Sequence, residues 1–453
     1  MRIFIDLQGA QSGSRFRGIG RYSISLAKAM IRNCGHHEIF ILLNGLFPDT
    51  IDEIRESFSG ILPDHHIIVF SAVGPVDELN IENKWRIHAS ELLREKFIYD
   101  LAPELLLVSS LFEGATDNSI TSVGKFFPEI LTAVILYDII PFLYPERYID
   151  WEPLRKWYYR KLEFLKRADF LLAISRSAQQ EAIDNIGIEK ERIVNISSAA
   201  DITFSKIDIT EDIFSMLRTR FGIKRSFLMH MSAFELRKNF DGLIKAFGLL
   251  PSNLRKEYQL VLVCKLNNEE KKILRDIAVK AGLDEDDMVL TGYVSDEELM
   301  ILYSACHLFV FPSFHEGFGL PALEAMSCGV PTIGSSTSSI PEVIGREDAL
   351  FDPASTKSMA CLIERVLTDA SFWQSLKLHA VKQSKKFSWD QSAKDAISAF
   401  EQLNNEKSDN GCKNSYYKLI NEIAQIANEY RLTNQDIITM AVAIDENEKK
   451  ASK

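Results

Sequence analysis

Two glutamates, Glu316 and Glu324, stand in this chain with seven residues between them. The apolar run at 308–311 that precedes them is typical of a buried parallel strand. Pro321 suits the first turn of a helix, and Gly329 suits its C-terminal stop. This spacing predicts Glu316 in the loop at the carboxyl end of a strand and Glu324 about one turn into the next helix. Because open α/β sheets bind ligands at that edge, the two carboxylates are predicted to hold a polar, oxygen-rich ligand.

The residues between the two glutamates carry a family resemblance. Gly-Phe-Gly-Leu-Pro at 317–321, framed by Glu316 and Glu324, is similar to the signature of retaining glycosyltransferases of the GT-B fold, family 4 type. The resemblance implies that Glu316 holds hydroxyls of a donor sugar, together with the backbone of Gly317, Phe318, Gly319 and Leu320. It implies that Glu324 holds the ribose of the nucleotide. The alternative is a loop-to-helix junction with two solvated carboxylates.

Length and composition restrict the class of protein. With 453 residues the chain exceeds one typical hydrophobic core, so two domains plus additions are expected. The formal charge of −11 argues against general nucleic-acid binding. The six cysteines form no Cys-x-x-Cys pair, which favours reduced thiols over a zinc site. No apolar run is long enough to span a bilayer, and a strand starts directly at Met1, so we expect a cytoplasmic location, at the inner face of the membrane if the chain contacts one.

Short apolar runs alternate with helical stretches along the chain, which predicts an α/β fold with two parallel sheets, each covered on both faces. The predicted strands lie at 3–5, 39–43, 67–70, 105–108, 133–136 and 170–174 in the first half, and at 227–229, 260–263, 289–290, 308–311 and 331–333 in the second. The resemblance implies that these two Rossmann-like domains face a cleft, as in the GT-B fold.

The predicted organisation has four parts. Residues 1–205 form a Rossmann-like acceptor-side domain, and residues 206–385 form a Rossmann-like nucleotide-sugar domain. By the resemblance, residues 386–403 are a helix that crosses back to the first domain. Residues 404–453 form a linker and a helical tail whose apolar residues recur at helical spacing. That tail could pack on the enzyme, mediate oligomerisation or dock a partner.

A basic pair, Arg237 and Lys238, follows the first predicted strand of the second domain. Arginine can chelate two phosphate oxygens and lysine supplies a mobile point charge, so the pair suits a diphosphate. The family has a basic pair here, with lysine its more regular member. Some members carry the arginine several residues earlier, near Ala233 in this chain, and the alternative for both residues is a solvated helix start.

A glycine-containing loop follows the first strand and precedes a helix expected from Arg21. Gly18 and Gly20 would let the backbone approach an anionic ligand, and Arg17 adds positive charge. A dinucleotide fingerprint would need a third glycine where Ser23 stands, so NAD binding is discounted. The family has a glycine-rich loop here, close to the diphosphate and the acceptor.

Polar residues also end other strands of the first half. Tyr137 and Asp138 stand where many family members have His-Asp, so an acid or base role for Tyr137 is in doubt, whereas a hydrogen bond to a sugar hydroxyl is still open. Asp138 could orient its loop or bind an acceptor hydroxyl, and a buried Tyr–Asp turn is the alternative. Glu113 could meet the acceptor.

Two further segments have both structural and functional interpretations. Val294 precedes a capping box at 295–298, and the resemblance places its backbone beside the nucleobase, although a plain strand–turn–helix explains the segment equally well. The basic and aromatic helix at 151–167 could touch a membrane surface or an anionic acceptor, yet its apolar stripe favours packing on the sheet.

The resemblance implies transfer of a glycosyl unit from a nucleotide sugar with retention of configuration. Lys238, Arg237 and backbone N–H groups would stabilise the leaving diphosphate without a metal cofactor. The residues around Gly18, Glu113 and Tyr137 look most like those of bacterial mannosyltransferases of polymannose O-antigen synthesis, which implies GDP-mannose as donor and a lipid-diphosphate-linked oligosaccharide as acceptor. The alternatives are a family-4 transferase that uses a UDP-sugar and a non-catalytic GT-B scaffold that docks an assembly partner through the tail.

Overall fold

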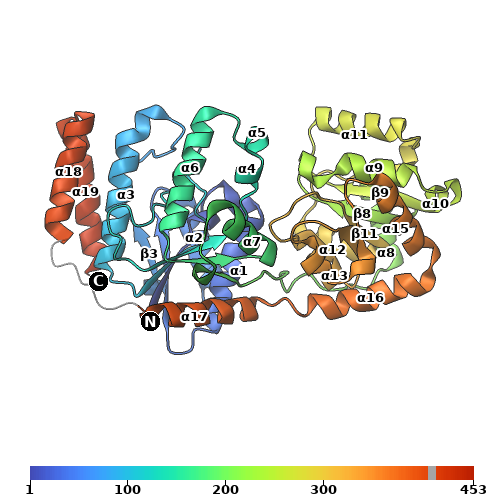
Figure 1. The fold of residues 1–453 in the computed structure, drawn as a ribbon, viewed down its shortest axis with the longest axis horizontal. Helices are drawn as coiled ribbons and strands as arrows, with labels where there is room; N and C mark the ends of the chain where they lie inside the picture. The colour runs from blue at the N-terminus through green and yellow to red at the C-terminus, as the bar shows by residue number, and fades with distance from the viewer. Residues whose placement is uncertain (407–414, 453) are drawn as a thin grey trace. The chain divides into compact units, whose positions relative to one another are not determined.

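The computed structural model describes residues 1–406 and 415–452, which form two compact units (Figure 1). The first unit comprises Met1–Ile174, Ala178–Ser197 and the part of the chain from Trp389 onward. The second unit comprises Ser175–Ser177 and Ser198–Ser388. Most of the predicted linker, including Cys412, lies outside the described residues.

The sheet of the first unit is parallel throughout the described residues, with the strand order β3-β2-β1-β4-β5-β6-β7. Every strand predicted for the first half is confirmed, because each is an apolar run buried on both faces. The short strand β7 was not predicted. The bounds are β1 Arg2–Asp6, β2 Glu38–Asn44, β3 Ile67–Phe70, β4 Leu105–Val108, β5 Thr132–Leu136, β6 Phe170–Ala173 and β7 Ile193–Asn195.

Helices cover both faces of this sheet. Their apolar stripes meet the strands, as Leu26 and Met30 of α1 and Leu162 and Leu165 of α6 illustrate by their nearly complete burial. Core packing is therefore confirmed for the stripe of α6. The bounds are α1 Gly18–Arg32, α2 Pro48–Phe58, α3 Lys84–Asp100, α4 Ile140–Leu143, α5 Pro145–Tyr148, α6 Glu152–Arg167 and α7 Arg176–Ile186.

The second unit has its own parallel sheet, with the order β10-β9-β8-β11-β12-β13. The predicted strands are again present, and β13, a pair of residues, was not predicted. The strands are β8 Ser226–Met231, β9 Tyr258–Val263, β10 Met288–Leu290, β11 Leu308–Phe311, β12 Thr332–Ser335 and β13 Leu350–Phe351. The helices are α8 Glu211–Phe221, α9 Phe240–Gly248, α10 Ser252–Glu257, α11 Asn268–Lys280, α12 Asp296–Ala305, α13 Leu320–Ser327, α14 Ile340–Ile344, α15 Thr356–Thr368 and α16 Ala370–Ser384.

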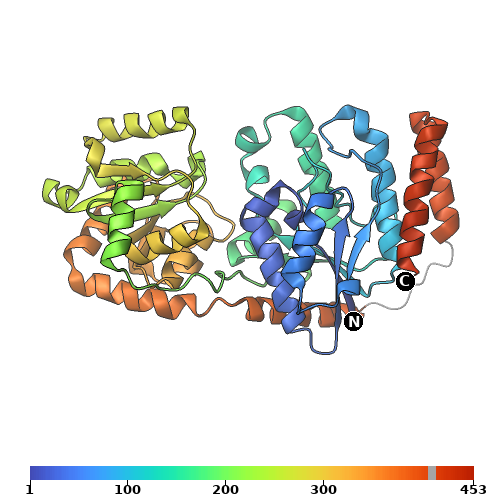
Figure 2. The same ribbon diagram turned by 180° about the vertical axis from the view of Figure 1, so that it is seen from behind.

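The C-terminal helices pack on the first unit. Helix α17, Trp389–Glu406, lies along α1. Helices α18, Ser415–Tyr430, and α19, Asn434–Ala451, form a pair against α3 (Figures 1 and 2). Leu419, Ile426 and Met440 are buried in that contact. None of the described helices combines the length and the apolar composition that a membrane crossing requires.

A buried ion pair joins α3 to the first strand. Asp6 ends β1 and Arg94 lies in α3, and the exposed fractions of their side chains are 1% and 0%. The guanidinium of Arg94 donates through Nε and Nη2 to Asp6, and through Nη1 to the carbonyl of Ser122 at 2.8 Å. Gln8 also donates to Asp6, at 3.0 and 3.1 Å. The ion pair therefore connects the end of β1 to α3, the helix against which the C-terminal hairpin of α18 and α19 packs.

Replacing Arg94 by methionine should lower the free energy of unfolding by about 3–5 kcal/mol, because the substitution leaves the Asp6 carboxylate buried without its cation. The measurement is urea denaturation of wild type and variant. Lys84→Met, on the exposed side of the same helix, is the matched control and should change the free energy by less than about 0.5 kcal/mol. A loss for Arg94→Met as small as the control's would contradict this role of the pair.

Candidate active site

Glu316 lies in the loop that follows β11, as predicted, and its side chain is buried. Two serines after β12 hold this loop. The N–H of Glu316 donates to Ser338 Oγ at 3.0 Å, and Ser339 Oγ donates to the carbonyls of Glu316 and Phe318 at 2.9 and 2.7 Å. The loop backbone is thereby fixed by neighbours outside the Glu-x7-Glu segment.

The basic pair meets this carboxylate. Lys238 Nζ donates to Glu316 Oε1 at 2.7 Å and to Oε2 at 2.9 Å, and Arg237 Nη1 donates to Oε2 at 2.8 Å. Arg237 also donates to Glu235 and to the carbonyl of His315. The sheet order explains the encounter: β8 and β11 are neighbouring parallel strands, so the loops after them share one edge.

The electrostatics of the cluster keep Glu316 ionised. Burial by itself would raise the pKa of Glu316, but Lys238 and Arg237 lower it to about 2. Lys238 is itself only 8% exposed. Two cations and a carboxylate thus share a desolvated corner, where charge interactions are stronger than in water.

Glu324 lies one turn into α13, as predicted, and it is 7% exposed. Its Oε2 accepts a hydrogen bond of 3.0 Å from the hydroxyl of Tyr303, a fully buried residue of α12. Burial, and then the nearby Glu324 carboxylate, raise the pKa of Tyr303, so the phenol stays a donor. This hydrogen bond fixes the orientation of the Glu324 carboxylate. The sequence did not reveal the contact, because Tyr303 looks like an ordinary core residue.

The glycines and apolar residues at 317–320, between the two glutamates, also have structural roles. Gly319 caps α13 with a φ of 116°, which a residue with a Cβ rarely adopts. Leu320 opens the helix, and Phe318 is buried edge-on against Phe387 at 5.6 Å. Gly317 is partly exposed, beside Glu316. Val294 directly precedes the predicted capping box, which is present between Ser295 and Glu298.

A hydrogen-bonded histidine behind the basic pair was also missed. His230, fully buried in β8, contacts the carbonyl of Val310 through Nδ1 at 3.0 Å and Ser232 Oγ through Nε2 at 2.8 Å. Burial lowers the pKa of His230 to about 3, so the ring is neutral. With Nδ1–H donated to the carbonyl, Nε2 accepts from Ser232, and the Ser232 oxygen is left as an acceptor.

In the first unit, the structure corrects the description of the glycine loop. Gly18 and Gly20 lie in the first turn of α1, which starts at Gly18 and not at Arg21, and Arg17 is its exposed N-cap residue. A Cβ on Gly20 would lie 2.5 Å from the Cα of Arg15. Gly20 is therefore required by the packing of the chain's own loop on the helix, whereas Gly18 is exposed at the helix start.

Tyr137 and Asp138 are engaged with their own unit. The hydroxyl of Tyr137 donates to the carbonyl of Ser109 at 3.0 Å and lies 3.2 Å from Ser23 Oγ. Burial raises the pKa of Tyr137 well above its usual range, so it does not act as a base. Asp138 accepts from the N–H of Ile140 at 3.0 Å, which is the loop-orienting role considered from the sequence.

Glu113 is 5% exposed and accepts from two serine hydroxyls, Ser12 at 2.9 Å and Ser110 at 2.8 Å. Burial raises the pKa of Glu113 despite these bonds. Ser12 also caps the short helix Gly13–Phe16 in the glycine loop. Glu113 therefore links the loop after β4 to the loop before α1, and both belong to the edge at which an acceptor is expected.

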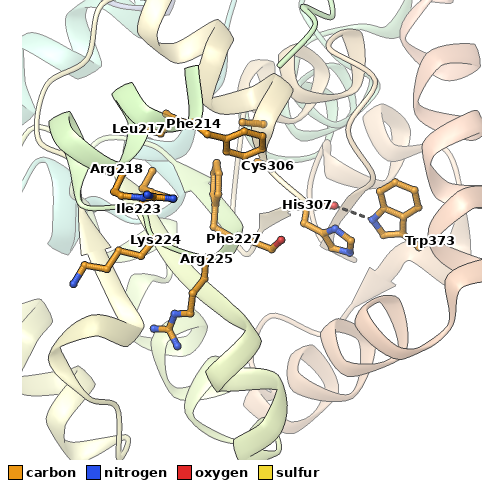
Figure 3. Close-up of a pocket in the computed structure, with 12 residues that line it drawn as sticks. Phe214, Leu217, Arg218, Ile223, Lys224, Arg225, Phe227, Cys306, His307 and Trp373 are labelled. Carbon is orange, nitrogen blue, oxygen red and sulfur yellow. Dashed lines mark hydrogen bonds between the residues drawn. The ribbon is translucent and has the colours of Figure 1, made fainter. Parts of the chain in front are cut away.

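Two other clusters are distinct from these residues. A cavity of about 330 Å³ lies at the amino ends of β8 and β11, the edge opposite Lys238 and Glu316 (Figure 3). Two of its three cations, Lys224 and Arg225, pair with Asp286 and Asp287, and Trp373 donates to the carbonyl of His307.

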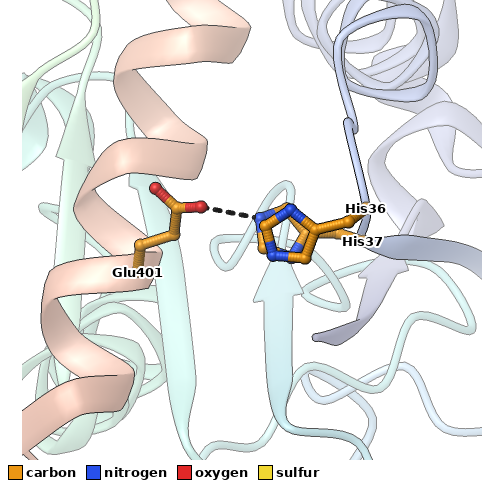
Figure 4. A group of neighbouring side chains, drawn as sticks. All are labelled: His36, His37 and Glu401. Atoms are coloured by element: carbon orange, nitrogen blue, oxygen red, sulfur yellow. Dashed lines mark hydrogen bonds and ion pairs between the residues drawn. The ribbon is translucent and has the colours of Figure 1, made fainter.

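The second cluster, His36, His37 and Glu401, has ligand atoms within 4.8 Å of one another (Figure 4). Both ring nitrogens of His37 are already engaged, Nδ1 by the amino group of Met1 and Nε2 by Glu401, each at 3.0 Å. The cluster therefore serves to join α17 to the start of β2.

Comparison with known proteins identifies the second unit. Residues 218–387 match the family model described as Glycosyl transferases group 1. They contain the basic pair, Glu316 and Glu324. The resemblance inferred from 316–329 is thereby confirmed.

The chain is 40% identical over 404 residues to the Serotype-specific mannosyltransferase WbdA of Escherichia coli, and the match covers 89% of this chain and 48% of that protein. The chain thus spans about half the length of this relative. It is 29% identical over 392 residues to the O-antigen chain mannosyltransferase B of Escherichia coli, covering 85% of this chain and 96% of the relative.

Among solved structures, Anabaena Alr3699/HepE in complex with UDP and glucose superposes with a TM-score of 0.65 at 18% identity, covering 89% of this chain and all of that one. A sucrose-phosphate synthase from Thermosynechococcus elongatus gives 0.64 at 18% identity, covering 90% and 100%. These likenesses confirm the predicted GT-B fold.

The stability that Glu316 contributes should depend on pH in a defined direction. Its folded-state pKa of about 2 lies below the ordinary 4.5, so the contribution is complete above about pH 4.5 and is lost as the pH falls toward 2. The difference in Tm between wild type and Glu316→Gln should therefore be constant from pH 7 to 5 and shrink between pH 4.5 and 3. Glu347→Gln, an exposed control, should show no such trend. A difference independent of pH would contradict the ion cluster.

Proposed function

We propose that this chain, whose residues 218–387 form a group 1 glycosyltransferase domain, transfers a mannosyl unit from GDP-mannose to a hydroxyl of a lipid-linked oligosaccharide in O-antigen synthesis, with retention of configuration. The observation that carries the proposal is the buried cluster of Lys238, Arg237 and Glu316 at the carboxyl edge of the second sheet. Mannose and the O-antigen are supported by the names of the relatives that span most of this chain.

The two cations suit the diphosphate of the donor. As the bond to the sugar breaks, negative charge grows on the leaving phosphate oxygens, and preorganised cations in a desolvated site stabilise that charge. Lys238 supplies a point charge and Arg237 a planar donor, which is held in place by Glu235 and by the carbonyl of His315. In this mechanism the protein's own cations take the role that a metal ion has in other folds.

The two glutamates suit the hydroxyl groups of the donor. A carboxylate accepts hydrogen bonds from vicinal hydroxyls, and Glu316 is kept ionised for this by Lys238 and Arg237. In the proposed complex Glu316 shares these cations with the diphosphate and accepts hydrogen bonds from the sugar. Glu324, oriented by Tyr303, accepts the ribose hydroxyls.

The acceptor is assigned to the first unit. Glu113, Tyr137 and the start of α1 at Gly18 belong to the carboxyl edge of its sheet. No residue is assigned as a covalent nucleophile. The leaving phosphate takes the proton of the acceptor hydroxyl on the same face of the sugar, which preserves the anomeric configuration.

A donor panel tests the proposed activity. With a mannoside acceptor, purified protein should release GDP from GDP-mannose faster than it releases nucleotide from GDP-fucose, UDP-glucose or UDP-galactose. Glu316→Ala should reduce the rate at least about 100-fold, because it removes a contact to the reacting sugar. Glu347→Ala, an exposed glutamate of the same unit, should retain full activity.

Two other functions give different results in that panel. Preferential turnover of a UDP-sugar would identify that UDP-sugar, instead of GDP-mannose, as the donor. The chain shares its fold with a protein solved with UDP and glucose. Absence of turnover with every donor, together with a Glu316→Ala variant that still complements a deletion strain, would identify a scaffold and overturn the enzymatic proposal.

Replacing Tyr303 by phenylalanine should weaken donor binding while the chemical step is retained. The variant loses the hydrogen bond that orients Glu324, so KM for the donor should rise roughly tenfold with kcat within about twofold. Tyr293→Phe, on an exposed tyrosine of the same unit, is the control. An equal KM for Tyr303→Phe and wild type would rule out an orienting role for Tyr303.

A further inference from the structure

A second cavity in the first unit is lined by residues from the amino-terminal halves of α3 and α6. Figure 1 shows these two helices side by side. Its volume is about 510 Å³, within the range of small-molecule sites in proteins. Tyr430, the last residue of α18, completes the wall, so the C-terminal hairpin contributes to the cavity. Polar and aromatic side chains of the other elements face it as well, among them Glu78, His88, Glu91, Lys125, Trp157 and Arg160.

Four of the six charged lining residues form one ion-pair network, and the other two, Lys84 and Lys156, add positive charge. Arg160 binds both Glu78 and Glu91, and Lys125 Nζ donates to Glu91 at 2.8 Å. Burial would raise the pKa of Glu91, but Arg160 and Lys125 lower it to about 2. Lys161, beneath the cavity, contacts Glu78 at 2.9 Å. These ion pairs fix hydrogen-bond donors and carboxylate acceptors in one place.

The remaining wall is aromatic and aliphatic. Trp157 and Tyr430 are half-buried, and His88 lies edge-on to Tyr430 with the ring centroids 6.1 Å apart. Burial, and then Lys125, lower the pKa of His88, so its ring is neutral and offers one donor and one acceptor. The indole N–H of Trp157 is buried and has no hydrogen-bond partner among the residues that the structure describes.

Backbone hydrogen bonds connect the cavity to the predicted acceptor segment. The N–H of Glu78 donates to the carbonyl of Gly114 at 2.9 Å, and that of Leu79 donates to the carbonyl of Ala115 at 3.0 Å. Gly114 directly follows Glu113, which binds Ser12 of the loop before α1. The cavity therefore adjoins the far side of the segment that holds Glu113.

We propose that this cavity binds the oligosaccharide chain of the acceptor, a few sugar units away from the hydroxyl that reacts. The proposal rests on the function proposed above. Apolar faces of sugar rings would pack on Trp157 and Tyr430, and sugar hydroxyls would bond to Glu78 and Arg160.

The two carboxylates, Glu78 and Glu91, favour a neutral polyol over an anion. A phosphate or lipid headgroup entering the cavity would meet Glu78 and Glu91, whose partner cations are already engaged. Among the rim lysines, Lys156 contacts Glu152 at 2.6 Å on the exposed surface, a pair of little energetic weight. Hydroxyl groups both donate and accept, and so match a site with both kinds of partner.

A remote subsite should make affinity depend on acceptor length. Each bound sugar unit raises the effective concentration of the reacting hydroxyl at Glu113, so a longer acceptor should have a lower KM. The dependence should require Tyr430, and through it the packing of α18 and α19 on α3.

The first test measures binding without donor. Titration of the full chain with mannotetraose, followed by calorimetry, should give saturable binding. Trp157→Ala and Tyr430→Ala should weaken that binding at least about tenfold. Trp151→Ala and Tyr417→Ala replace exposed aromatic residues of the same elements outside the cavity, and they should bind as wild type does.

The second test compares KM for mannobiose and mannotetraose as acceptors. The wild-type ratio should exceed about 5 and fall toward 1 in Tyr430→Ala. Failure of mannotetraose to bind, an unchanged length ratio, or equal binding by all four variants would overturn the subsite, while transfer to mannobiose would still support the proposed function. Saturation of the cavity by anionic phospholipid vesicles with no response to mannotetraose would also overturn it. Absence of transfer to either acceptor would count against the function itself.

Discussion

One buried carboxylate shared by two cations organises the second unit. Glu316 is buried where water cannot solvate it, and it is stable as an anion because Lys238 and Arg237 donate to it. The arrangement depends on β8 and β11 being neighbours, since only then do the loops after them meet. A diphosphate needs the same two cations, and the hydroxyl groups of a sugar need the same carboxylate. The cluster therefore has, before any ligand binds, the groups that the proposed nucleotide-sugar site requires.

Most of the fold could be predicted because the strands are apolar runs, buried on both faces, between amphipathic helices. The short strands β7 and β13 were not predicted. The position of Glu324 in its helix could be predicted from Pro321 and Gly329, which mark the two ends of α13.

The partners of the site residues could not be predicted, because they come from elements that are distant in sequence. Ser338 and Ser339 support the loop of Glu316 from beyond β12, and Tyr303 supports Glu324 from α12. A serine-rich turn and a core tyrosine have no distinctive pattern in a single sequence. Gly20 shows the opposite error, since a glycine interpreted as room for a ligand is required by contact with Arg15.

In the proposed function, the second unit binds the donor and the first unit binds the acceptor. Its buried ion pairs, Asp6 with Arg94 and Arg160 with Glu78 and Glu91, hold α3 and α6 in place beside the edge that carries Glu113. The C-terminal hairpin packs on the same helix α3 and places Tyr430 at the cavity. A tail beyond the two sheets thus has a structural contact that can serve acceptor binding.

The most direct measurement is a crystal structure of the chain with GDP-mannose. We predict phosphate oxygens within about 3 Å of Lys238 Nζ and the Arg237 guanidinium, a mannose hydroxyl on Glu316 and the ribose on Glu324. A nucleotide bound elsewhere, with Glu316 still occupying both cations, would contradict the account.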